Sequence, residues 1–221
     1  SESVRNQIED LANKSRNAME SEDSPFRQVV QKRGNLSTAQ TRARILLKTQ
    51  QTEELEKLLE GLGKHPEPEE ALPYRKLVEG YLAELRGDYE SALQCYLLII
   101  EQQAKPLLID ALMRITHASL ELGDSANALS ALECLSQLSP MYQPYYAEML
   151  RLIGRPLDAI DVYNAYIVRF PDNLYIQLKL AHLYIAINST ASAQILLRHI
   201  LDKHPDNEAA TKMLVSLQAT S

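Results

Sequence analysis

The feature that most constrains this chain is a short pattern, a turn residue followed by an alanine, that recurs four times. The turn residues are 36, 31 and 34 positions apart, at Gly87, Gly123, Gly154 and Asn188. An alanine follows each of them after five positions, at Ala92, Ala128, Ala159 and Ala193. A period of this length is typical of an array of helical repeats, in which each copy is one small structural unit.

Each copy predicts a helix, a tight turn and a second helix. Gly and Asn accept the left-handed conformation that closes a helix, and Asp88, Asp124 and Ser189 directly after the turn are predicted caps of the next helix. The alanine marks the place where the two helices approach closely. Large apolar residues are predicted to pack nine and twelve positions after each turn, at Tyr96/Ile99, Leu132/Leu135, Tyr163/Tyr166 and Leu197/Ile200.

Two further features recur at fixed distances from the turn. A small residue stands seven positions before it in three copies and Thr in the other, at Gly80, Thr116, Ala147 and Ala181. A proline stops the second helix 17 positions after the turn in three copies, at Pro140, Pro171 and Pro205. Pro106 comes 19 positions after its turn, which predicts two extra residues in that connection.

As a set, these residues resemble the tetratricopeptide-repeat family, and the resemblance covers residues 73–205. It implies an all-α fold, a right-handed α-solenoid of stacked antiparallel helix hairpins that binds segments of partner proteins. The chain departs from the family at Glu79, where a large apolar residue is usual. Its third copy is about three residues short, and we expect the loss in the first helix.

The repeat frame divides the chain into four parts. Residues 1–34 are predicted to be an N-terminal helix and connector, or alternatively a segment that packs on the array as a cap or across its groove. Residues 35–68 are predicted to form a degenerate hairpin with helices at 38–50 and 52–62. Residues 69–206 are four tetratricopeptide-like hairpins, and residues 207–221 are a capping helix that begins at Asn207 and covers the last hairpin.

Charge and hydropathy exclude several classes of partner. The net charge is −6 and the pI is about 5.4, whereas nonspecific nucleic-acid binding needs a basic face. No apolar run approaches the roughly 20 residues that cross a bilayer, and no basic start precedes an apolar stretch. Cys95 and Cys134 are predicted to be buried free thiols, which favours a reducing compartment. We therefore expect a cytoplasmic protein, or a periplasmic or membrane-associated one if the chain is part of a longer protein.

The sequence offers little that indicates catalysis. Dinucleotide, phosphate-loop, zinc-protease and serine-hydrolase motifs are missing from it. The five histidines have no zinc-ligand spacing, and the Gly61–Lys64 stretch is better explained as a helix end than as a phosphate loop. We therefore predict a protein that is not an enzyme and that uses no cofactor and no metal.

The candidate site is the groove that the first helices of the hairpins are expected to line. It contains aromatic, apolar and a few charged residues, namely Tyr74, Leu77, Tyr81, Met113, His117, Met141, Tyr145, Glu148, Arg151, Tyr175 and His182. Tyr81, His117 and His182 are predicted to be exposed, while Leu77 fits the groove and hairpin packing equally well. Some family members hold a C-terminal carboxylate with Lys and Asn here. Because this chain has Tyr81, His117, Leu77 and Met113 at those places, we do not expect such a clamp.

Two functions agree with these observations. The first is a scaffold or adaptor whose groove holds a peptide segment or helix of a partner protein and supports assembly of a larger complex. The second is a structural segment of a larger multidomain or cell-envelope secretion or assembly protein, which acts through domain packing or self-association. The aromatic run from Tyr142 to Tyr146 is the predicted homo-oligomer surface in that case.

Overall fold

Left-handed turn residues divide the chain into helical hairpins, as predicted. The backbone φ is 76° at Gly87, 74° at Gly123, 80° at Gly154 and 60° at Asn188. At the first of these turns the amide of Gly87 donates to the carbonyl of Glu84, and the amide of Asp88 donates to that of Ala83. These bonds satisfy the last carbonyls of the preceding helix, so that the next helix can begin two residues later.

The computed structural model describes residues 25–219, and the side chains of residues 35–218. All regular structure among these residues is helical, so the fold is all-α, as predicted. Residues 1–24, which hold most of the predicted N-terminal helix and connector, lie outside the described residues. The chain divides into two compact units, which meet in sequence between Leu107 and Leu108 and are described separately below.

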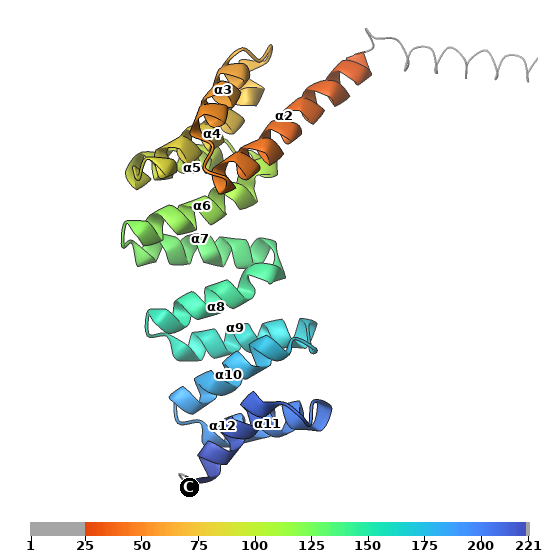
Figure 1. Ribbon diagram of the computed structural model, residues 1–221, viewed down its shortest axis with the longest axis vertical. Helices are drawn as coiled ribbons and strands as arrows, with labels where there is room; N and C mark the ends of the chain where they lie inside the picture. The colour runs from red at the N-terminus through yellow and green to blue at the C-terminus, as the bar shows by residue number, and fades with distance from the viewer. Residues whose placement is uncertain (1–24, 220–221) are drawn as a thin grey trace, which may run out of the picture. The chain divides into compact units, whose positions relative to one another are not determined.

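Within residues 25–107, unit 1 contains two helices that precede the first clear hairpin, then that hairpin (Figure 1). Its elements are α2 (Pro25–Lys48), α3 (Thr52–Gly63), α4 (Pro68–Leu85), α5 (Tyr89–Glu101) and the short 3-10 turn η1 (Lys105–Leu107). α2 runs unbroken through residue 34, so the expected boundary between 34 and 35 falls inside a helix. The extra residues predicted before Pro106 form η1 and a left-handed turn at Gln103.

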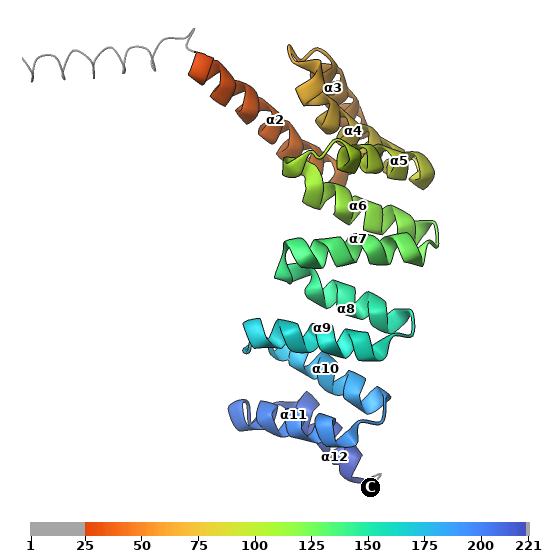
Figure 2. The same ribbon diagram turned by 180° about the vertical axis from the view of Figure 1, so that it is seen from behind.

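Unit 2 is a continuous series of three hairpins and a final helix, each helix packed on the next (Figure 2). Its elements are α6 (Leu108–Glu121), α7 (Ser125–Leu138), the 3-10 turn η2 (Pro140–Tyr142), α8 (Gln143–Leu152), α9 (Pro156–Arg169), α10 (Leu174–Ala186), α11 (Thr190–Lys203) and α12 (Glu208–Ala219). The first helix of the short repeat, α8, has only 10 residues, which confirms where the deletion lies.

The predicted helix caps are confirmed at the aspartates. The Asp88 carboxylate accepts a hydrogen bond from the Ser91 amide, and that of Asp124 accepts one from the Asn127 amide. Ser189 does not cap α11 in this way, because its hydroxyl donates to the Ser192 hydroxyl instead. Asn207 precedes α12 as predicted, and its side chain accepts from the Ala210 amide.

The contact between the two helices of a hairpin is built on residues with little or no side chain. The four alanines that follow the turns are fully buried, and so are Ala147 and Ala181 on the facing helices. At Gly80 the ring of Tyr96 lies where a Cβ atom would stand. The Tyr96 hydroxyl donates a hydrogen bond to the carboxylate of Glu84, so that both buried polar groups are hydrogen-bonded inside the hairpin.

The cysteines depart from expectation at one position. Both thiols are free; Cys95 is half-buried, which raises its pKa, but Cys134 is exposed. The buried stripe of α7 consists of Ala128, Ala131, Leu132 and Leu135. Position 134 falls off that stripe, which is why the prediction of burial for Cys134 is wrong.

Replacing Ala128 with Arg tests the repeat frame. The substitution forces a charged side chain into a fully buried contact between α6 and α7, so we expect a loss of about 3 kcal/mol or more in the free energy of unfolding. Urea unfolding followed by circular dichroism measures it. The matched control is Ala126→Arg at an exposed position of the same helix, which should change stability by less than about 0.5 kcal/mol. Equal stability of the two variants would contradict the frame.

Gly80→Ala tests the close approach in unit 1. Alanine favours a helix by about 1 kcal/mol over glycine, but the new methyl group would overlap the Tyr96 ring. We expect a net destabilisation of about 1–2 kcal/mol, measured by urea unfolding. At Gly61 a Cβ atom would meet nothing within 4 Å, so Gly61→Ala should be neutral or stabilising. A Gly80→Ala variant as stable as Gly61→Ala would show that the contact is loose.

Candidate protein-binding surface

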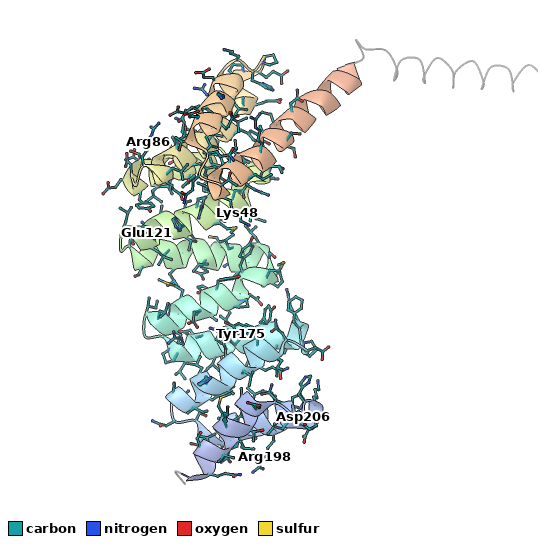
Figure 3. The ribbon with its side chains drawn as sticks, viewed as in Figure 1. Lys48, Arg86, Glu121, Tyr175, Arg198 and Asp206 are labelled. Atoms are coloured by element: carbon teal, nitrogen blue, oxygen red, sulfur yellow. The ribbon has the colours of Figure 1, made fainter. Side chains whose placement is uncertain are left out.

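The candidate surface lies on α6, η2–α8 and α10, the first helices of the three hairpins of unit 2. Helical spacing of three or four residues brings its members to one side of each helix. We call it the first-helix face of unit 2; it consists of Met113, His117, Met141, Tyr145, Glu148, Arg151, Tyr175, Lys179 and His182. Figure 3 labels Tyr175 on α10 as a reference point.

One part of this face is apolar and strongly exposed. The side chain of Met141 is 72% exposed and those of Tyr145 and Tyr175 are 65% exposed. The Tyr142 hydroxyl lies 3.4 Å from the Met113 sulfur, which joins η2 to α6, and the Tyr142 ring lies 6.4 Å from that of Tyr145. These contacts hold the thioether and the rings side by side as one patch across two hairpins.

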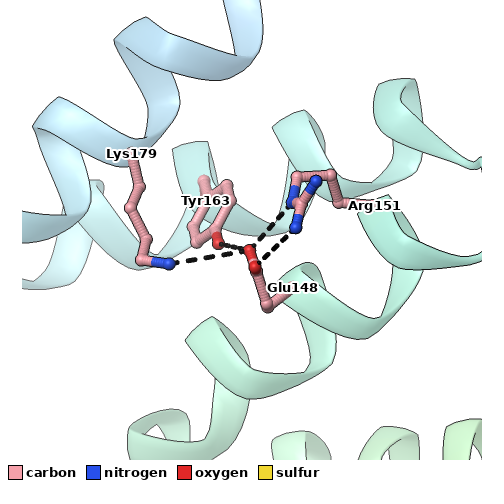
Figure 4. Close-up of polar contacts among 4 residues, drawn as sticks. All are labelled: Glu148, Arg151, Tyr163 and Lys179. Atoms are coloured by element: carbon pink, nitrogen blue, oxygen red, sulfur yellow. Dashed lines mark hydrogen bonds and ion pairs between the residues drawn. The ribbon is translucent and has the colours of Figure 1, made fainter.

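The other part is a polar cluster centred on the carboxylate of Glu148 (Figure 4). Arg151 donates two hydrogen bonds to it, of 2.8 and 3.1 Å, from the next turn of α8. The hydroxyl of Tyr163 on α9 donates a third at 3.2 Å, and the ammonium group of Lys179 on α10 lies 3.7 Å away. A single carboxylate therefore ties three consecutive helices together.

The cluster shifts the ionisation of its members. Hydrogen bonding from Arg151, and then the positive charge of Lys179, lower the pKa of Glu148, although partial burial opposes them. Burial is the main reason why the pKa of Tyr163 is strongly raised, and the neighbouring Glu148 charge adds to it. Glu148 is therefore ionised and the Tyr163 hydroxyl protonated at neutral pH, as their hydrogen bond requires.

A shallow pocket of about 310 Å³ opens over this cluster. Its walls are Glu148, Arg151, Tyr163, Lys179, His182, Leu183 and Ala186. The ammonium group of Lys179 also lies 5.3 Å from the centre of the Tyr175 ring, within the range of a cation–π contact. The pocket thus has two cations, Arg151 and Lys179, against one carboxylate.

His182 is exposed at the rim of this pocket, as predicted, whereas His117 is half-buried. The imidazole of His117 lies 4.0 Å from the Glu121 carboxylate on the next turn of α6. Side-chain contacts thus join Met113 of α6 to Tyr142 of η2, and Glu148 of α8 to Lys179 of α10.

The corresponding residues of unit 1 are not open. Tyr81 is only 2% exposed and Leu77 is fully buried, so the prediction of an exposed Tyr81 is wrong. The Tyr81 ring packs at 6.3 Å from that of Tyr96, and helix α2 packs on α4. Tyr74 is half-buried, and burial raises its pKa. The predicted groove residues of α4 are therefore not part of an open surface.

Two residues of the cluster were missed by the sequence reasoning. Lys179 carries a usable signal, because it stands four residues after Tyr175 and three before His182, on the same side of α10. Tyr163 is a predicted packing residue of the second helix, and its ring is buried as expected. The sequence does not show that its hydroxyl extends between the helices to Glu148.

The part of the chain that the structure describes has no group of three or more His, Cys, Asp or Glu side chains arranged to hold a metal ion. Within residues 25–219 no helix combines the length and the apolar character needed to span a membrane.

Comparisons with known proteins agree with the repeat architecture. Residues 154–217, which run from the turn at Gly154 into α12, match a family model described as tetratricopeptide repeat. No curated protein sequence matches the chain. Members of this repeat family are typically scaffolds without catalytic activity.

Two solved structures illustrate the similarity of fold. A putative kinesin light chain from Podosopora anserina, described as having nearly identical TPR-like repeats, is 18% identical with a TM-score of 0.56, over 84% of this chain and 96% of that one. A MamA protein is 16% identical with a TM-score of 0.51, over 66% of this chain and 80% of that one. Residues 154–217 therefore match the tetratricopeptide repeat, and the chain shares the all-α fold of these solved repeat structures.

Proposed function

We propose that the first-helix face of unit 2 holds a segment or helix of a partner protein, and that the chain serves as a scaffold or adaptor in a larger complex. The observation that carries this proposal is the exposure of Met141, Tyr145 and Tyr175 on adjacent first helices. Large apolar side chains gathered on one face mark interaction sites. Tyrosine and methionine are enriched in protein interfaces, where tyrosine often carries much of the binding energy.

The charges of the polar cluster determine which kind of partner side chain the pocket attracts. Glu148 is already hydrogen-bonded to Arg151 and Tyr163, and Lys179 lies close to it, so the pocket keeps an excess of one positive charge. An acidic side chain of the partner would be attracted to this excess, while apolar residues would cover the Met141 and Tyr145 side chains. Charge complementarity of this kind fixes orientation and selects partners.

Self-association is the second candidate, since Met141 and Tyr145 are among the most exposed apolar side chains described. If the patch joins two copies, the mass measured by light scattering should rise with concentration, and Tyr145→Ala should abolish the rise. A constant monomer mass would exclude this alternative.

We propose a cytoplasmic setting for this scaffold. The two free thiols, one exposed at Cys134, support a reducing compartment. A disulfide or other oxidation product at Cys134 in protein isolated from its source would count against this setting.

Partner binding is tested by affinity capture with a double variant. Tyr145→Ala combined with Tyr175→Ala removes two exposed rings from the face and changes no buried residue. Helicity and melting temperature should therefore be unchanged. We expect at least about tenfold less partner to be retained, because interface tyrosines are frequent hot spots. The matched control, Val168→Ala with Ile195→Ala, removes exposed apolar groups from the second helices. Equal retention by both double variants would place the site elsewhere.

Glu148→Gln tests the electrostatics of the polar cluster. Because the folded state lowers the pKa of Glu148 below its ordinary value of 4.5, the cluster adds stability above that pH and loses it as pH falls through the folded pKa. We expect the variant to be less stable than wild type at pH 7, with the difference in urea midpoint shrinking toward about pH 3. For Glu133→Gln, at an exposed position of α7, the difference in urea midpoint from wild type should not shrink as the pH falls. A difference that is constant with pH would contradict the assignment.

A further inference from the structure

We propose that the side of α4 that carries Leu77 and Tyr81 is a second binding site, which takes an amphipathic helix. In this structure α2 occupies that site, and we propose that a partner helix can replace it. The partner it fits is a helix with a narrow stripe of Leu and Ala. This site is separate from the first-helix face of unit 2, and each proposal can fail without the other.

Equivalent positions in different hairpins show that the α4 side is covered. Ten residues before the turn, Met113 on α6 is 44% exposed, whereas Leu77 on α4 is fully buried. Six residues before the turn, His182 on α10 is exposed, whereas Tyr81 is buried. Residue size does not explain the difference, since Tyr81 is the larger side chain. α3 and α5 pack on α4 as α9 and α11 pack on α10, and α2 is the additional helix that packs on α4. We therefore infer that α2 covers Leu77 and Tyr81.

The way α2 packs differs from that of an ordinary first helix. In the other hairpins the two helices pack chiefly on each other, but α2 packs as extensively on α4 as on its own neighbour α3. The Gln40 side-chain amide donates at 3.1 Å to the carbonyl of Pro106, beyond the end of α5. α2 therefore lies across α4 and reaches the last turn of unit 1, and both views show it diverging from α3 toward its N-terminus (Figures 1 and 2).

The contacts of α2 are those of a docked helix. Within residues 35–48, the buried apolar residues of α2 form a single stripe at spacings of three and four, namely Leu36, Ala39, Ala43 and Leu46. An exposed ion pair of 2.9 Å between Arg42 and Glu54 adds a contact with α3. Apolar anchors at this spacing are the mode in which helices bind grooves of other proteins.

The rest of unit 1 has its own contacts. α3 packs on α4 and α4 packs on α5, without α2 between them. The connection from α2 to α3 is short and contains Gln50 with φ of 55°, an uncommon conformation for a residue other than glycine. Release of α2 would uncover Leu77 and Tyr81 while α3, α4 and α5 keep their mutual packing.

The test adds the α2 segment to the full chain as a separate peptide. The probe is a fluorescently labelled peptide of residues 35–49, and the receptor is the full chain with Ala43→Asp, which places a charge in the buried stripe of α2. Anisotropy should show the peptide binding this variant at least about tenfold more tightly than wild type, because the site is no longer occupied. The matched control is Ile45→Asp on the exposed side of α2, which should behave as wild type. A labelled peptide that itself carries Ala43→Asp should not bind.

A folded Ala43→Asp chain that fails to bind the wild-type peptide would overturn the proposal. Hydrogen exchange of the wild-type chain gives an independent result even if that variant does not fold. We expect the amides of residues 36–48 to exchange faster than those of α4 and α5, through opening of α2 alone. Exchange of α2, α4 and α5 at one common rate would show that α2 is an inseparable part of the core.

Discussion

The close approach of paired helices is the constraint on which the rest of this structure depends. It requires a residue with almost no side chain at each crossing, which the buried alanines and Gly80 supply. It also requires a connection so short that only a left-handed residue can close it, at Gly87, Gly123, Gly154 and Asn188. Turn and alanine together fix the register of each hairpin, and the large apolar residues then pack in that register.

A fixed register has consequences for the surface. Because the turns hold the first helices of unit 2 in one register, residues at the same distance from the turn face the same way in its successive hairpins. The first-helix face of unit 2 arises from this repetition, with Met and Tyr at one part and the Glu148 cluster at the other. In unit 1, α2 packs on α4, and Leu77 and Tyr81 of α4 are buried at positions that correspond to exposed ones on α6 and α10.

The sequence predicts what depends on local conformation and spacing. Turns, aspartate caps, buried alanines and the short α8 all follow from residues a few positions apart, and the structure confirms them. What it did not predict depends on contacts between distant segments. Tyr81 is buried in unit 1, where α2, α3 and α5 all pack on α4, and Lys179 and Tyr163 meet Glu148 only through the stacking of three helices. A repeat frame treats copies as equivalent, and these residues are where the copies differ.

Photo-crosslinking from inside the first-helix face of unit 2 tests directly whether these helices form the partner-binding surface. A photoreactive phenylalanine would replace Tyr145 on α8 in one protein and Val168 on α9 in another, both exposed positions. After irradiation in the source cell, we expect a discrete crosslinked partner from position 145 and none from position 168. A partner captured from position 168, with none from position 145, would contradict it.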